Sequence, residues 1–164
     1  FAALGVPPEE DEGRRLEEAV GSREILVNLT GNKLGFRQTA AVVGLCKYYI
    51  GNDTATAHMA AAQGLPSLVP SSVAKDYALS GNASNFLSRW YPYDVPAVIV
   101  QPKHGLDECR NSDDYYGCKA NFPHCITQIT PEHMLEAFQI LKDCAARGIK
   151  EPYYFVARSE QHQH

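Results

Sequence analysis

Short apolar runs alternate with segments of helical spacing along most of this chain. The runs are rich in β-branched, aromatic and leucine side chains and are bounded by turn residues, which is typical of buried strands. We expect strands at residues 25–29, 48–50, 67–69 and 97–100. Helical spacing is found at residues 9–19, 36–46, 56–63 and 132–147. This alternation predicts an α/β protein with a parallel sheet that is covered by helices on both faces.

The residue types around position 131 mark the start of the last helix. Thr130 is a favourable N-cap, Pro131 suits the first helical position, and Glu132 complements the helix dipole. A short apolar segment at residues 152–156 and a polar end follow this helix. We therefore assign residues 151–164 to a C-terminal tail.

The most informative stretch, residues 48–69, is predicted to form a strand, a tight turn, a short helix and a second strand. Asn52, Asp53 and Thr54 are all residue types that favour the N-cap of a helix. The first N–H groups of a helix lack partners within it and carry partial positive charge, so this helix end predicts an anion-binding site. Thr54 adds a hydroxyl group, and His58 lies one turn further along the same face.

Asp53 would repel a phosphate group that faced it. We therefore expect this side chain either to cap the helix or to accept hydrogen bonds from neutral hydroxyl groups such as those of a sugar. A second interpretation stays open, in which Asp53 and Thr54 only cap the helix and His58 is a packed histidine.

The other candidate residues lie in turns that lead from a strand into a helix. We look there because ligands of open parallel sheets bind beyond the carboxyl ends of the strands. Three such turns are predicted, at residues 5–9, 30–34 and 51–54. Glu9 can accept hydrogen bonds from a ribose diol, and Leu34 can pack against a nucleobase. The competing interpretations are a solvated glutamate of the first helical turn and a leucine of the core.

Composition argues against several classes of protein. The chain has 164 residues, of which 45% are hydrophobic and 21% are charged, as in ordinary globular domains. A net charge of −4 without any run of Lys or Arg argues against nucleic acid as a partner. No apolar stretch approaches the ~20 residues that a membrane span needs, and no secretory signal is visible. The chain begins with Phe-Ala-Ala-Leu-Gly rather than methionine, so we expect a fragment of a longer protein.

Five cysteines are present, and without a secretory signal free thiols or a metal site are more natural than disulfides. A loop-like stretch at residues 104–125 carries three of them together with His104 and His124. Zinc and iron sites usually show closely spaced ligand pairs, whereas the gaps here are long. We therefore predict no metal site, with free thiols or an adventitious disulfide instead. If a metal is bound, the candidate ligands are Cys109, Cys118, Cys125 and Cys144.

Residues 52–66 read Asn-Asp-Thr-x-x-x-His-x-Ala-Ala-Ala-x-Gly-x-Pro. This pattern resembles the signature of glycosyltransferase family 9, the bacterial lipopolysaccharide heptosyltransferases. Ala55 stands where that family usually has a glycine.

Further stretches extend the resemblance over most of residues 1–140. Residues 28–34 are similar to the family's Leu-Thr-Gly-Lys-Thr-Ser-Leu stretch in a shortened form. Residues 90–93 and 129–132 resemble its Trp-x-Pro-Tyr and Ile-Thr-x-Glu motifs. The chain departs from the family at residues 70–72, where Pro-Ser-Ser replaces Gly-Pro-Thr.

The resemblance implies a Rossmann-like domain at residues 1–150, with a cysteine-containing loop at 104–125. This domain would be the C-terminal, donor-binding half of a glycosyltransferase with GT-B architecture, truncated at its N-terminus. The donor would be a nucleotide-diphosphate sugar similar to ADP-heptose. The positions that match the family's donor-binding residues are Asp53, Thr54, Ala55, His58, Glu9 and Leu34.

The resemblance also implies an activity, namely inverting transfer of a heptose-like sugar to a lipopolysaccharide core or a related bacterial glycan. The family's catalytic base is an aspartate of the N-terminal domain, so we expect no catalytic residue in this chain and no transfer by this chain alone. Transfer in the family requires no metal or other cofactor. The expected partners are the sugar nucleotide and, through the N-terminal domain, the acceptor glycan. The implied location is the cytoplasm, with peripheral association with the inner membrane.

Two other functions stay open. A parallel sheet with a helix N-terminus can hold a nucleotide without catalysing a reaction, which would make the chain a binding module. A domain whose cysteines bind a metal in a structural role is the other possibility. Nucleotide binding would favour the enzyme or the binding module, whereas stoichiometric zinc or iron without nucleotide binding would favour the metal domain.

Overall fold

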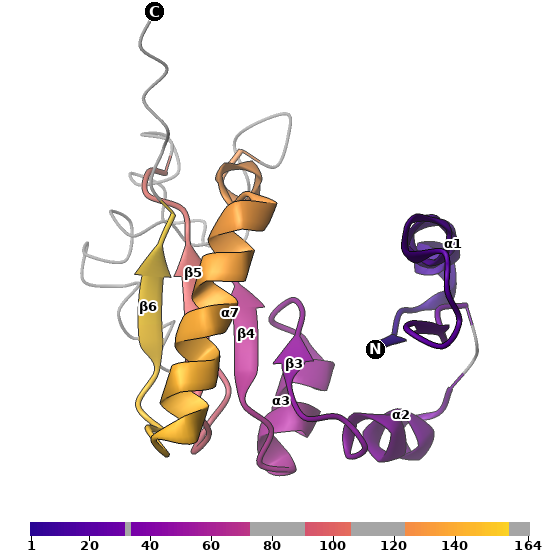
Figure 1. The fold of residues 1–164 in the computed structure, drawn as a ribbon, viewed down its shortest axis with the longest axis horizontal. Coiled ribbons are helices and arrows are strands. Elements are labelled where there is room, and N and C mark those ends of the chain that lie inside the picture. The colour runs from indigo at the N-terminus through magenta and orange to yellow at the C-terminus, as the bar shows by residue number, and fades with distance from the viewer. Residues whose placement is uncertain (32–33, 73–90, 106–123, 158–164) are drawn as a thin grey trace, which may run out of the picture. The chain divides into compact units, whose positions relative to one another are not determined.

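The computed structural model describes residues 1–31, 34–72, 91–105 and 124–157, in two compact units (Figure 1). The first unit is Phe1–Cys46 and the second is Lys47–His164. Trp90, Cys109, Cys118 and the end of the predicted tail lie outside the described residues. Within the described part of the chain, no helix has the length and apolar character that a membrane crossing requires.

The first unit contains a two-stranded parallel sheet with a helix between its strands. Its elements are β1 (Ala2–Ala3), η1 (Pro7–Glu9), α1 (Glu10–Val20), β2 (Val27–Asn28) and α2 (Phe36–Val43). β2 is shorter than the strand predicted at residues 25–29, although the Leu29 N–H still donates to Ala3 O at 2.9 Å. The predicted order of strand, helix and strand is confirmed in this unit.

The second unit contains a four-stranded sheet whose strands lie in chain order (Figure 1). Its elements are β3 (Tyr49–Ile50), α3 (Ala55–Ala62), β4 (Ser67–Pro70), β5 (Ala97–Gln101), η2 (Ile126–Gln128), α7 (Pro131–Ala146) and β6 (Tyr153–Val156). All neighbouring strands are parallel, which confirms the predicted α/β fold. β6 differs from expectation, because these residues were assigned to a tail and instead pair with β5.

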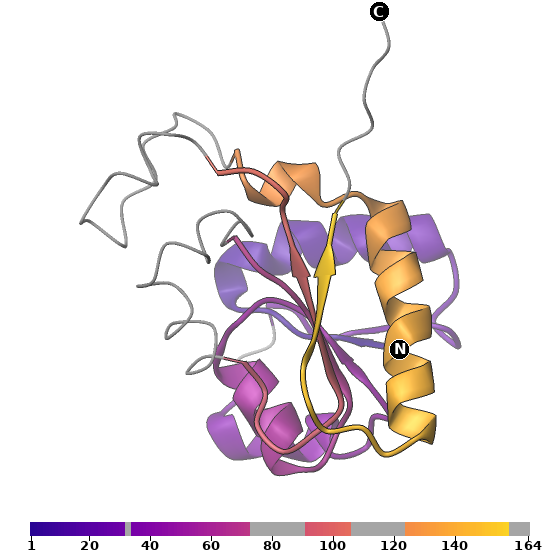
Figure 2. The same ribbon diagram turned by 90° about the vertical axis from the view of Figure 1, so that its left-hand side faces the viewer.

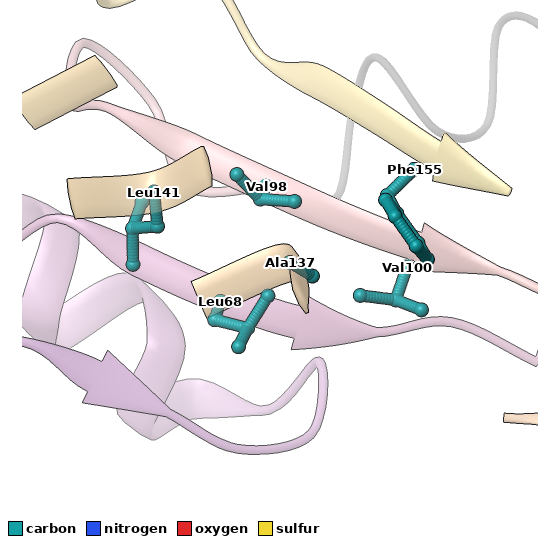
Figure 3. Close-up of a cluster of buried hydrophobic side chains, with 6 residues drawn as sticks. All are labelled: Leu68, Val98, Val100, Ala137, Leu141 and Phe155. Atoms are coloured by element: carbon teal, nitrogen blue, oxygen red, sulfur yellow. The ribbon is translucent and has the colours of Figure 1, made fainter. Parts of the chain in front are cut away.

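Side chains of the central strands alternate between the two faces of this sheet, and a different helix covers each face. Ala57 of α3 packs against Val69 and Ile99 on one face. On the other face, α7 packs against the strands through a buried hydrophobic cluster (Figure 3). The cluster contains Leu68, Val98, Val100, Ala137, Leu141 and Phe155. Figure 2 shows α7 and α3 on opposite sides of the strands. The prediction of helices on both faces is therefore confirmed for this unit.

The N-terminus of α7 is capped as the sequence predicted. Thr130 Oγ1 accepts a hydrogen bond from the His133 N–H at 3.4 Å, and Pro131 occupies the first helical position. Thr130→Ala removes this cap and is expected to lower the free energy of unfolding by ~1 kcal/mol. Thr130→Ser keeps the hydroxyl group and should retain most of the stability. Chemical denaturation of both variants tests this, and equal losses would contradict a capping role.

Candidate functional site

The 51–54 turn leads from the carboxyl end of β3 into the N-terminus of α3. Thr54 has the extended backbone of an N-cap residue, with φ −139° and ψ 176°, and its side chain makes no capping hydrogen bond. The residues at positions 52–55 are exposed. The N–H groups of Ala55 and Thr56 in the first turn of α3 therefore have no side-chain cap from Thr54.

Asp53 and His58 lie beside each other at this helix end. Asp53 Oδ1 is 3.9 Å from His58 Nε2, and the two side chains are 37% and 46% exposed, respectively. The N-cap is Thr54 rather than Asp53. The interpretation of His58 as a packed histidine is therefore wrong, and both side chains are accessible to solvent.

The pKa of the Asp53 carboxyl is raised above its ordinary value, mainly by partial burial, and the positive charge of His58 opposes this shift. A raised pKa means that the folded chain binds the proton more tightly than the unfolded chain does. The contribution of Asp53 to stability is therefore fully present below its unfolded-state pKa of ~3.9 and is lost as the pH rises through the folded-state pKa.

An NMR titration of the Asp53 carboxyl carbon is expected to show a midpoint above ~3.9. His58→Gln removes the opposing positive charge, so this variant should raise the midpoint further. A midpoint at or below the ordinary value, or one that falls in His58→Gln, would contradict the described balance of burial and charge.

Tyr49 folds back over the 51–54 turn. Its Oη donates to Asn52 O at 2.9 Å. A Cβ atom at Gly51 would lie 2.6 Å from Tyr49 Oη and 2.9 Å from Tyr49 Cζ, so the ring occupies space that only a glycine leaves open. Burial raises the pKa of the Tyr49 hydroxyl, the nearby Thr54 hydroxyl opposes this, and the charge of Asp53 adds to it. At neutral pH the hydroxyl therefore keeps its proton and can donate it.

Sequence reasoning assigned Tyr49 only to a strand and missed its contacts with the turn. A signal was present, because residues two positions apart in an extended strand lie on the same face. A tyrosine two residues before a glycine can therefore fold over that glycine.

Glu9 and Leu34 belong to the first unit, and their roles toward a ligand stay predictions. Glu9 Oε2 accepts a hydrogen bond from the Val6 N–H at 2.9 Å, and the Glu9 N–H donates to Val6 O at 2.8 Å. The Glu9 carboxylate thus closes the turn after β1, while the residue remains exposed. Leu34 is half-buried and directly precedes Gly35, the N-cap of α2.

The turn after β2 is fixed by a polar network that sequence reasoning also missed. Asn28 Oδ1 accepts from the Thr30 N–H at 3.0 Å and from Thr30 Oγ1 at 2.6 Å, and Asn28 Nδ2 donates to Glu17 Oε2 at 3.3 Å. Gly13 of α1 is buried against this network, and a Cβ atom there would overlap with Thr30 Oγ1. The only signal in the sequence was a glycine inside a predicted helix.

The predicted cysteine positions divide between described and undescribed parts of the chain. Cys125 Sγ lies 3.8 Å from His124 Nδ1, and Cys144 is a buried thiol of α7. Among the described residues, no group of three or more His, Cys, Asp or Glu side chains could hold a metal ion. Cys109 and Cys118 lie outside the described residues.

A parallel sheet with helices on both faces and an exposed helix N-terminus beyond a strand defines a Rossmann-like α/β protein. Comparison with known families places residues 3–69 within the model of glycosyltransferase family 9, the heptosyltransferases. The resemblance predicted from the sequence is therefore confirmed over these residues, which include Glu9, Leu34 and the whole 51–54 turn. Searches of curated proteins and of solved structures gave no match.

Proposed function

We propose that this chain is the donor-binding part of an inverting glycosyltransferase. In this proposal the 51–54 turn and the first turn of α3 bind a nucleotide-diphosphate sugar similar to ADP-heptose. The observation that carries the proposal is the exposed N-terminus of α3, which lacks a side-chain cap and lies within the segment that matches the family model. Helix amides at such an end attract and orient phosphate groups.

The charge of each protein group determines which part of the donor it would contact. The amides of Ala55 and Thr56 and the Thr54 hydroxyl suit the diphosphate. The Asp53 carboxylate repels phosphate but accepts hydrogen bonds from sugar hydroxyls, so we assign the sugar to Asp53. His58 Nε2 lies 3.9 Å from Asp53 Oδ1, and where His58 is protonated it offsets part of the negative charge that Asp53 brings to the site.

The roles proposed for Glu9 and Leu34 concern the first unit by itself. Glu9 would accept hydrogen bonds from the ribose, and Leu34 would contact the base. Glu9 lies in the turn after β1, and Leu34 lies at the end of the turn after β2. These positions support the two roles, because residues in such turns contact the ligands of parallel sheets.

Sugar transfer requires two further effects. A general base must deprotonate the acceptor hydroxyl, and positive charge must stabilise the departing diphosphate. The amides of α3 would supply the second effect, so the scheme requires no metal. The base would belong to an N-terminal domain, and this chain alone would bind the donor without transferring the sugar. The acceptor would be a lipopolysaccharide core or a related glycan, met in the cytoplasm at the inner membrane.

Isothermal titration calorimetry of the 164-residue chain with ADP and AMP tests donor binding. We expect ADP to bind at least about tenfold more tightly, because its second phosphate adds charge-assisted hydrogen bonds worth roughly 1.5–3 kcal/mol. UDP serves as a probe of base preference. Equal affinities for ADP and AMP, or no binding of either diphosphate, would contradict the proposal.

A non-catalytic nucleotide-binding module is the second candidate. Ala55 favours it, because the methyl group of this exposed residue keeps a ligand further from the backbone than a glycine would. The chain joined to a complete N-terminal domain separates the two candidates. Transfer of the sugar would support the enzyme, and donor binding without transfer would favour the module.

A further inference from the structure

The side chain of Thr30 has a fixed direction in the turn after β2. The Thr30 N–H is a donor only, so the atom of Asn28 that it meets at 3.0 Å must be the amide oxygen, Oδ1. The same oxygen lies 2.6 Å from Thr30 Oγ1 and cannot donate, so the Thr30 hydroxyl group donates its single proton to Asn28. That proton is therefore not available to another acceptor.

Two further contacts hold this arrangement against α1. Asn28 Nδ2 donates to Glu17 Oε2 at 3.3 Å, and Glu17 Oε1 accepts from Arg23 Nε at 3.0 Å, so both ends of the Asn28 amide are engaged. Gly13 of α1 is buried, and a Cβ atom there would overlap with Thr30 Oγ1. The hydroxyl group of Thr30 thus occupies a space that only a glycine leaves open.

The methyl group of Thr30 faces the turn after β1 in the same unit. β1 and β2 are parallel neighbours with Ala3 opposite Asn28, so Gly5 follows opposite Thr30. An atom at the Cβ position of Gly5 would lie 3.1 Å from Thr30 Cγ2 and 2.8 Å from Glu9 Oε2. The Thr30 methyl group and the Glu9 carboxylate therefore both pack on Gly5.

A single rotation step of the Thr30 side chain would change the group that lies beside Glu9. The χ1 angle of threonine has three staggered wells, and a step of about 120° places the hydroxyl group where the methyl group lay. From there the hydroxyl group could donate to the Glu9 carboxylate. The Val6 N–H, at 2.9 Å, uses one of the roughly four acceptor positions of this carboxylate, and a second internal donor would compete with a ribose diol for the others.

We propose that Asn28 is a positioning residue of the ribose subsite in the first unit. It keeps the Thr30 hydroxyl group bound on the α1 side, so that a methyl group lies beside Glu9 and the carboxylate stays available to the ribose hydroxyls. This inference rests on the ribose role proposed above for Glu9. It adds a residue that acts on the ligand only through Thr30.

Calorimetry with ADP and 2′,3′-dideoxy-ADP isolates the contribution of the ribose hydroxyls. In the unchanged chain, ADP should bind at least about tenfold more tightly, because its ribose hydroxyls donate to a charged group. Asn28→Leu has a similar size and removes both polar groups, so the preference for ADP should fall to about twofold or less. A purely structural role of Asn28 would instead weaken both ligands by the same factor and keep the preference.

A second substitution tests whether the Thr30 hydroxyl group causes this loss. Thr30→Val has nearly the same shape as the original side chain and has no proton to donate to Glu9. Added to Asn28→Leu, it should restore a preference for ADP of about tenfold. A preference that stays low in the double variant, or one that is unchanged in Asn28→Leu alone, would overturn the proposal. Asn28→Ala removes the same polar groups and is measured in the same way if Asn28→Leu fails to fold.

The rotamer of Thr30 is measurable in the ligand-free chain. Three-bond NMR couplings to Thr30 Cγ2 should report one χ1 well in the unchanged chain and a mixture of wells in Asn28→Leu. Averaged couplings in the unchanged chain would overturn the role of Asn28 and leave the donor site intact. If the unchanged chain binds ADP no more tightly than 2′,3′-dideoxy-ADP, or binds neither, the ribose role of Glu9 fails and that of Asn28 fails with it.

Discussion

An Ala55→Glu substitution is expected to reduce ADP affinity by about 100-fold or more, because a carboxylate at the first position of α3 occupies the place proposed for the diphosphate. Close contact between like charges costs several kcal/mol, and ~2.7 kcal/mol corresponds to this loss. The fold should persist, since an acidic residue in the first turn stabilises a helix by roughly 0.3–1 kcal/mol. Calorimetry with ADP and thermal unfolding of the same samples measure the two effects.

Ala62→Glu is the matched control. Ala62 is the last residue of α3 and is exposed, so this change adds the same charge at the other end of the same helix. ADP affinity should stay within about twofold of the unchanged chain, since exposed charges further apart than the Debye length of ~10 Å are largely screened. Equal losses in the two variants, or full binding in Ala55→Glu, would rule out a diphosphate at the N-terminus of α3.

Asp53→Ala is expected to affect the binding of ADP-heptose and of ADP differently. If Asp53 holds sugar hydroxyls, the affinity for ADP-heptose should fall about tenfold, because hydrogen bonds to a charged group contribute roughly 1.5–3 kcal/mol. The affinity for ADP should stay equal or increase, because the substitution removes a negative charge close to the phosphates. Calorimetric titration of the variant with both ligands gives the comparison.

Asp143→Ala controls for the change in net charge. Asp143 is an exposed residue of α7, the helix on the face of the sheet opposite α3. This variant should bind both ligands like the unchanged chain. A parallel loss of ADP and ADP-heptose in Asp53→Ala, or a large fall in melting temperature with unchanged binding, would count against a role of Asp53 toward the sugar.

Local patterns were sufficient to predict most elements of the second unit. β3, α3 and β4 follow from an apolar run, a cluster of N-cap residues, an alanine-rich segment and another apolar run. The start of α7 was predicted because Thr130 and Pro131 have strong positional preferences. Each of these signals lies within a few residues of the feature that it predicts.

β6 could not be predicted from such signals. Its sequence, Tyr-Tyr-Phe-Val, is short and lies next to a polar chain end, so it was assigned to a tail. Its place in the sheet comes from pairing with β5, more than 50 residues earlier in the chain, and from the burial of Phe155 against α7. Neither strand contains a local sequence feature that predicts pairing over such a separation.

In the candidate site too, local patterns predicted some features and missed others. The residue types at positions 52–58 were sufficient to predict an exposed helix N-terminus with Asp53 and His58 nearby. The hydrogen bond from Tyr49 to Asn52 O and the close packing of Gly13 on Thr30 depend on side-chain directions, which spacing alone does not specify. Both features fix the shape of a turn.

Hydrogen exchange of the chain with and without ADP-heptose tests the central claim most directly. The account predicts slower exchange of the amides at residues 52–58 when the ligand is bound, while the first turn of α7, whose N-cap is occupied by Thr130, exchanges at an unchanged rate. Unchanged exchange at residues 52–58 under conditions where calorimetry shows the ligand to be bound would contradict it.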